Sequence, residues 1–211
     1  MIYSENIFIC IVIPLLLSLL FIRREGFRFV LGLVIGMLVC LLSAYISAFT
    51  GTVSEMGHEQ VAVYISPVVE EIMKILPVLF VLFIFDPPSD RVFLFAVAVG
   101  VGFATFENCC YLLSVGSQSI TYMLIRGLAV GVMHIVSILF ATIGLMQMRE
   151  FKAMSLPAAF GAVIVSITYH ALYNLLVSEP GITSVIGYLL PGVTAVLLFL
   201  VNLRLRIRVK T

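Results

Sequence analysis

Glutamate, lysine and histidine side chains inside apolar sequence are the residues of this chain that could do chemistry. Glu70 and Glu71 are adjacent, and Lys74 follows within the apolar run 62–85. On a helix, this spacing lets one ammonium group reach both carboxylates. Such a group can hold one carboxylate ionised and another protonated, as acid–base catalysis requires. We therefore expect a functional site in this run.

Further polar residues occur in three later apolar runs. They are Glu107 with Asn108, Arg126 with His134, and His170 with Asn174. At 1.5 Å per helical residue, Glu70, Glu107 and His170 each lie roughly 12 Å below the outer end of an expected span. Arg126 and His134 lie at roughly 8 and 20 Å and share one helical face. We expect these side chains, from four helices, to meet in one cavity lined by protein.

The run 62–85 needs such a cavity because its charges are costly in lipid. Three charged residues at a helix centre cost about 9 kcal/mol, and the apolar residues of the run return roughly 5 to 9 kcal/mol. Pro67 and Pro77 bracket the charges. Either both prolines interrupt one helix, or Pro67 is its first residue, and the sequence leaves both readings open.

The elements that position these residues are those of an all-α membrane protein. The chain has 211 residues, of which 62% are hydrophobic and 11% charged, with a mean hydropathy of +1.21. Soluble domains do not have this composition. A span needs about 20 residues. The sequence therefore predicts one polytopic domain over residues 1–211, with its motif-bearing core at about 62–178 and seven transmembrane helices at 2–22, 27–49, 62–85, 91–115, 121–147, 157–178 and 184–203.

Basic residues predict the orientation. Of the 12 basic residues in the chain, Lys74 and Arg126 are the two that lie within expected spans and away from their first two residues. The others fall on one side when seven spans alternate, and basic loops favour the cytoplasm. We expect a multi-pass protein of the cell membrane with its N-terminus outside and its C-terminus cytoplasmic. The net charge of +1 gives no indication of nucleic-acid binding.

Pairs of glycines four residues apart predict close helix contacts. Gly32 with Gly36 and Gly127 with Gly131 have this spacing. Small residues at such positions let two helix backbones approach closely. We expect both pairs to lie at helix–helix contacts.

Four blocks of sequence follow one another between Pro67 and Asn174. They read VVEEIMKILPV, GFATFENCCYLL, RGLAVGVMHIVSILFATIG and YHALYNLL. With the order EExxK, FxxxEN, His and HxxxN, the chain resembles the PrsW-type intramembrane proteases, which are relatives of the CAAX-processing and Abi proteases. The resemblance implies a peptidase whose catalytic residues are Glu70, Glu71, Glu107, His134, His170 and Asn174, supported by Phe103, Lys74 and Arg126.

The resemblance also implies a mechanism in which a glutamate activates water without a covalent acyl-enzyme. Glu70 is then the general base, helped by Glu107 and His134. His170 and Asn174 would donate hydrogen bonds to the oxyanion, a contribution worth about 3 kcal/mol per donor in other hydrolases. Glu71 and Lys74 would hold these groups in place.

A metal is the alternative to this chemistry, because Glu and His are also zinc ligands and zinc activates water. The HExxH helix typical of many metalloproteases is not found in the sequence. We expect no cofactor, and we rank metal-free chemistry before zinc. A metal would be held by Glu70, Glu107, His134 and His170.

The resemblance implies a single-span membrane protein as substrate, cut near the outer membrane face, such as an anti-sigma factor. Trimming of prenylated C-termini is an alternative activity for a protein with this resemblance. Two other classes remain open: a proton-coupled carrier or channel that uses the Glu and His residues as a relay, and an inactive scaffold. The sequence does not predict the oligomeric state.

Overall fold

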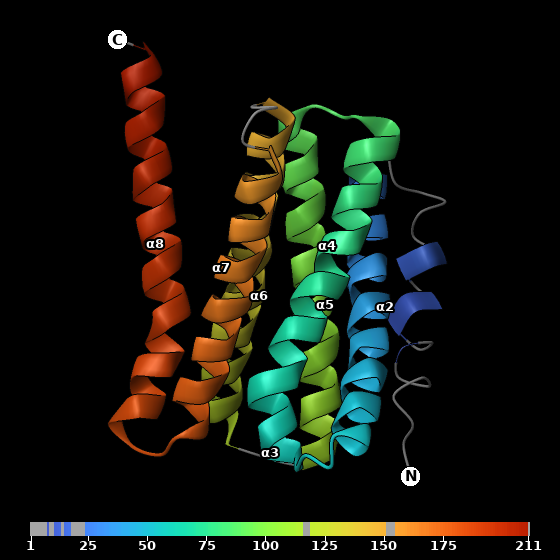
Figure 1. Cartoon of the computed structure of the whole chain (residues 1–211), viewed down its shortest axis with the longest axis vertical. Coiled ribbons are helices and arrows are strands. Elements are labelled where there is room, and N and C mark those ends of the chain that lie inside the picture. Colours follow the sequence, from blue (N-terminus) through green and yellow to red (C-terminus); the bar gives the residue numbers. More distant parts are fainter. Residues whose placement is uncertain are drawn as a thin grey trace.

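The computed structural model describes residues 8, 11–13, 15–17, 24–115, 119–150 and 155–210. The regular structure in these segments is helical, and the long helices run side by side as an antiparallel bundle (Figure 1). The elements are α2 (Arg24–Val53), α3 (His58–Gln60), the π-helical turn η1 (Val61–Ile65), α4 (Ser66–Phe85), α5 (Ser89–Val115), α6 (Ile120–Glu150), α7 (Ser155–Ser178) and α8 (Ile182–Lys210).

The prediction of an all-α membrane protein is confirmed. By length and composition, five helices could cross a membrane: Gly26–Val53, Ser89–Ser114, Ile120–Arg149, Leu156–Ser178 and Ile182–Val201. The predicted span 62–85 corresponds to η1 and α4, and it is not among these five helices because its three charges lie close together in the sequence. The predicted span 2–22 lies mostly outside the described residues. Phe8 is one of the described residues of this span, and it packs edge-on against Phe106 with ring centroids 5.6 Å apart.

The start of α4 shows where its two prolines lie in the helix. Pro67 lies in the first turn of α4, directly after the π turn, whereas Pro77 lies inside the helix. Proline has no N–H to donate and its ring clashes with the preceding turn, so a wider π turn accommodates Pro67 without breaking the helical path. At its other end, α4 stops at Asp86, which has a left-handed backbone with φ 41°.

Glycines hold α2 tightly against α5. A β-carbon at Gly36 would overlap the Val99 carbonyl, and one at Gly102 would overlap the Leu33 carbonyl. The predicted contact at Gly32 and Gly36 is therefore confirmed. For contacts within the chain, the same expectation is wrong for Gly127 and Gly131, because no described residue lies within 4 Å of a β-carbon built at either position.

Apolar side chains of α4, α5 and α6 form the largest core cluster, which includes Ile75, Val78, Val99 and Ile138. A second cluster joins α5, α6 and α7, with Met133 at its centre. Ionisable residues lie next to these core positions in the sequence and are buried with them. Helix packing therefore separates these ionisable side chains from lipid. In Figure 1, α8 stands at one side of the bundle, next to α7.

Candidate active site

Four helices bring the predicted residues together. Helix α4 supplies Glu70, Glu71 and Lys74, while α5, α6 and α7 supply Glu107, His134 and His170. Glu71, Lys74 and His134 are fully buried, and His170 is 2% exposed. The predicted residues therefore lie together inside the protein, where Lys74 pairs with Glu71 and Arg126 pairs with Glu107.

Glu71 is the most highly bonded carboxylate of the site. Its Oε1 lies 2.6 Å from Lys74 Nζ and 2.7 Å from His170 Nδ1. Its Oε2 accepts a hydrogen bond from Ser166 Oγ at 2.7 Å. A buried carboxylate with three donors is held rigidly, and it fixes the His170 ring with Nδ1 protonated.

Lys74 uses all three of its donors. They reach Glu71, Ser137 Oγ at 3.0 Å and His134 Nδ1 at 2.9 Å. Since an ammonium group only donates, His134 Nδ1 must accept, and the imidazole proton sits on Nε2. That nitrogen then donates to Glu107 Oε2 at 2.5 Å. The Phe103 ring covers this arrangement, with its centroid 4.7 Å from that of His134.

The contacts of Lys74 correct one detail of the sequence analysis. The spacing predicted that Lys74 would serve both neighbouring carboxylates. Among the described residues, its ion pair is with Glu71, and Glu70 is turned away. The pair therefore forms between Glu71 and Lys74, three residues apart, while Glu70 points across the bundle towards α7.

Glu70 faces His170 without a proton donor between them. The Glu70 Oε2 atom is buried and has no hydrogen-bond partner among the described residues, and it lies 3.7 Å from His170 Nε2. Because His170 Nδ1 carries the proton that binds Glu71, Nε2 turns a lone pair towards the carboxylate. Two facing acceptors repel one another unless a cation lies between them.

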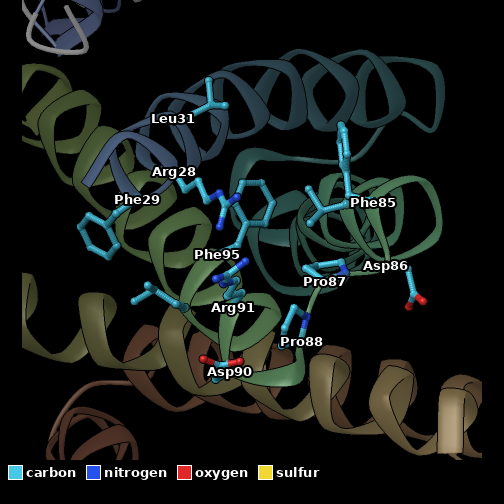
Figure 2. Close-up of a pocket in the computed structure, with 12 residues that line it drawn as sticks. Arg28, Phe29, Leu31, Phe85, Asp86, Pro87, Pro88, Asp90, Arg91 and Phe95 are labelled. Atoms are coloured by element: carbon cyan, nitrogen blue, oxygen red, sulfur yellow. The ribbon is translucent and has the colours of Figure 1, made fainter. Parts of the chain in front are cut away.

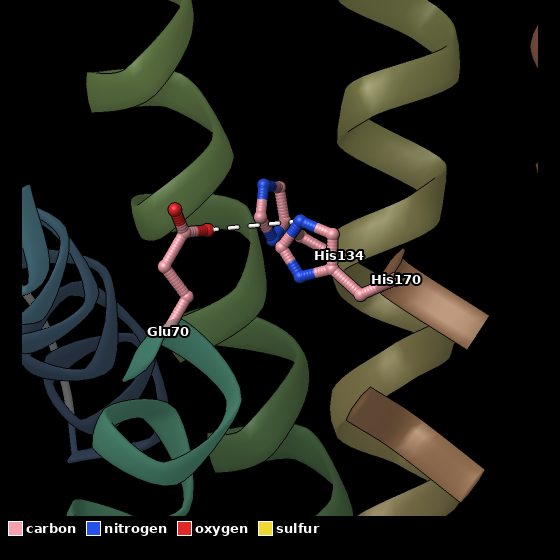
Figure 3. A group of neighbouring side chains, drawn as sticks. All are labelled: Glu70, His134 and His170. Atoms are coloured by element: carbon pink, nitrogen blue, oxygen red, sulfur yellow. Dashed lines mark ion pairs between the residues drawn. The ribbon is translucent and has the colours of Figure 1, made fainter. Parts of the chain in front are cut away.

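Glu70, His134 and His170 form a donor set that suits a metal ion. One ligand atom from each lies within 4.8 Å of the other two, and Figure 3 shows the three side chains converging from separate helices. Two imidazoles and one carboxylate are the protein ligands of many catalytic zinc sites. The unpartnered Glu70 oxygen supports this fit. His134 would join by exchanging one of its two present contacts.

Glu107 lies beside this triad and not within it, although the sequence analysis included it among four potential ligands. Its side chain is 30% exposed, and its Oε1 lies 3.4 Å from Arg126 Nη2. Arg126 also donates to Asn108 Oδ1 and stacks on Tyr111, 3.5 Å from the ring centroid. Arg126 and His134, which we placed on one helical face, both contact Glu107.

Asn174 lies apart from the reacting groups. Its Nδ2 donates to the Ala62 carbonyl at 2.9 Å, which ties α7 to the π turn. In this structure the amide is therefore occupied, and the predicted oxyanion role would require it to leave this contact.

The sequence analysis missed Ser137 and Ser166. Ser166 Oγ also lies 2.7 Å from the Ser137 carbonyl, so the two serines link α6 and α7 beneath the ion pair. A signal was present, because Ser137 follows His134 by three residues and Ser166 precedes His170 by four. Both serines therefore share a helical face with a site histidine.

Comparison with known families agrees with the geometry. The model of the PrsW family intramembrane metalloprotease matches residues 24–203. No curated protein and no solved structure shows significant similarity to the chain. The matched range covers all the helices that supply the site. The chain belongs to the PrsW family of intramembrane metalloproteases, as the resemblance of its four sequence blocks implied.

Proposed function

We propose that the chain is a metal-dependent peptidase that cuts a membrane-anchored protein, with Glu70, His134 and His170 as the metal ligands. Membership of an intramembrane protease family supports the peptidase class. The observation that carries the assignment of ligands is the buried Glu70 oxygen, which faces His170 Nε2 without a partner. This proposal departs from the metal-free chemistry that we expected from the sequence.

A divalent ion such as zinc would supply a water made acidic enough to attack a peptide carbonyl at neutral pH. The protein would supply the orientation of its ligands. Glu71 holds His170 by the 2.7 Å bond to Nδ1, the usual second partner of a metal-binding histidine. Lys74 balances the charge of Glu71.

Glu107 is the carboxylate best placed to move protons. Its 30% exposure leaves it accessible to water. The Arg126 guanidinium favours its ionised form, and the bond to His134 Nε2 holds it at the edge of the triad. In this scheme Glu107 accepts a proton from water and returns it to the leaving nitrogen. Glu70, the general base in the metal-free scheme, becomes a ligand.

The proposed substrate is a single-span protein, such as an anti-sigma factor, cut near the outer membrane face. The site lies in the first half of α4, on the side of the bundle that the positive-inside rule assigns to the exterior. In the predicted topology, the N-terminus is outside, the C-terminus is cytoplasmic, and seven spans cross the cell membrane.

The test combines metal analysis with cleavage of a single-span reporter by the reconstituted full chain. Glu70→Gln and His170→Ala should lose both bound metal and cleavage. Glu59→Gln and His58→Ala are matched controls because both residues are exposed in α3, and both should retain activity. Full cleavage by the Glu70 and His170 variants would refute the assignment.

The full chain reconstituted in sealed vesicles also tests the alternative function of a proton-coupled carrier. A continuous set of contacts runs from Glu107 through His134, Lys74 and Glu71 to His170, and a proton relay would need such a path. Proton uptake that depends on Glu70, in the absence of reporter cleavage, would favour transport over hydrolysis.

A further inference from the structure

A second cavity lies at the other end of the bundle from the metal-binding triad. It has a volume of about 560 Å³ and is formed by the start of α2, the end of α4 and the start of α5. Phe85, one of its lining residues, is roughly 22 Å along α4 from Glu70 at 1.5 Å per residue. The cavity is therefore separate from the active site, and its size is that of a small-molecule pocket.

Two arginines without counter-ions reach into this cavity. Figure 2 shows Arg28 and Arg91 entering the same part of it from α2 and α5, beside Phe95. Among the described residues, neither arginine forms an ion pair. Arginine at such a position recognises phosphate through paired donors.

The acidic residues of the cavity do not neutralise these arginines. Asp86 pairs with Arg149 at 3.3 Å, and Arg149 also donates to the Pro87 carbonyl at 2.7 Å. In Figure 2 the Asp86 and Asp90 carboxylates point away from the two guanidinium groups. The positive charge of Arg28 and Arg91 is therefore available to a ligand.

The rest of the wall is apolar, with Leu31, Val81, Phe85 and Leu94 among the lining residues. A free phosphate ion would leave this surface unused, whereas a phosphate that carries an acyl chain would cover it. The basic end of the bundle is also the predicted cytoplasmic end, where the leaflet contains anionic lipids.

We propose that this cavity binds an anionic phospholipid, with Arg28 and Arg91 on the phosphate and the acyl chain along the apolar wall. The negative charge of the phosphate and the apolar acyl chain would together determine which ligand the cavity binds. Bound there, it would brace α2, α4 and α5 against one another at the end of the bundle opposite the site.

The test uses the purified full chain in a neutral detergent with added phosphatidylglycerol or phosphatidylcholine at matched mole fractions. Thermal unfolding midpoints and the lipid retained in native mass spectra are the readouts. Phosphatidylglycerol should raise the midpoint and be retained, whereas phosphatidylcholine should do neither. Since two charge-assisted contacts are lost, Arg28→Gln/Arg91→Gln should need on the order of tenfold or more phosphatidylglycerol for the same effect.

Arg149→Gln is the matched control, because it removes one positive charge at the same end from a residue that pairs with Asp86 and does not itself line the cavity. It should change the midpoint equally in both lipids and preserve the difference between them. Both cavity arginines are exposed, so their replacement should not prevent folding. Equal effects of the two lipids, or a preference that survives in the double variant, would overturn the proposal. Inorganic phosphate that reproduces the effect alone would identify a free-phosphate site instead.

Discussion

Substitution by glutamine should have different effects on the thermal unfolding midpoint at the two adjacent glutamates, Glu70 and Glu71. Glu71→Gln removes one charge and keeps the hydrogen bonds. The amide oxygen can accept from Lys74 and His170, and the amide nitrogen can donate to Ser166 Oγ, which then donates to the Ser137 carbonyl. What remains is a buried ammonium group with no counter-charge within its ion-pair distance.

The size of the effect follows from burial. Glu71 and Lys74 are both 0% exposed, so water cannot screen the stranded charge. Breaking a buried ion pair by removing one partner costs roughly 3 to 5 kcal/mol. For a chain of this length, about 1 kcal/mol corresponds to 2–4 °C, so the unfolding midpoint should fall by roughly 6 to 20 °C. Glu70→Gln should leave the midpoint unchanged or raise it, because its amide can donate to His170 Nε2.

The assay is thermal unfolding of the purified variants in one detergent after chelation, so that bound metal does not contribute to stability. Glu71→Gln/Lys74→Met should recover most of the loss, since a buried ion pair can be replaced by apolar groups at little net cost. Glu59→Gln, in the exposed α3, controls for loss of an acidic group. A fall of equal size in the Glu70 and Glu71 variants would refute the assignment of separate roles.

Three further outcomes are expected. A chelator should abolish reporter cleavage, and zinc should restore it in wild type but not in Glu70→Gln; activity that survives complete metal removal would restore the metal-free scheme. Gly36→Ala should lower the unfolding midpoint because its β-carbon meets the Val99 carbonyl, whereas Gly127→Ala should raise it slightly, since alanine stabilises a helix by about 1 kcal/mol relative to glycine. Ser166→Ala should cost about 1 to 3 kcal/mol through the carboxylate oxygen that it leaves without its donor, measured by the same unfolding assay.

The sequence was sufficient to predict that some of the site residues would lie at the same level, because depth in a helix follows from residue number. Glu70 and His170 were expected at one level, and the structure places them 3.7 Å apart. It was also sufficient to place Arg126 and His134 on one face, where both contact Glu107. Both are consequences of helical geometry alone.

The partner of each charge could not be predicted in this way. Spacing makes both glutamates neighbours of Lys74, and the choice of Glu71 depends on the rotation of α4 relative to α6 and α7. Likewise, the sequence does not reveal that Gly127 and Gly131 face away from other helices while Gly32 and Gly36 face α5. Those outcomes depend on tertiary packing, which a periodic pattern does not specify.

The charge balance of the site explains why one carboxylate is left without a partner. The three site carboxylates, Glu70, Glu71 and Glu107, stand against the ammonium of Lys74 and the guanidinium of Arg126, while both imidazoles are neutral in the hydrogen-bond network described. Glu71 and Glu107 have cationic partners, so an ionised Glu70 would leave a formal charge of −1 at the site. A buried uncompensated charge is costly, and α4 already carries two other buried charged residues, Glu71 and Lys74. A bound cation would offset this cost, which agrees with the proposed role of Glu70 as a metal ligand.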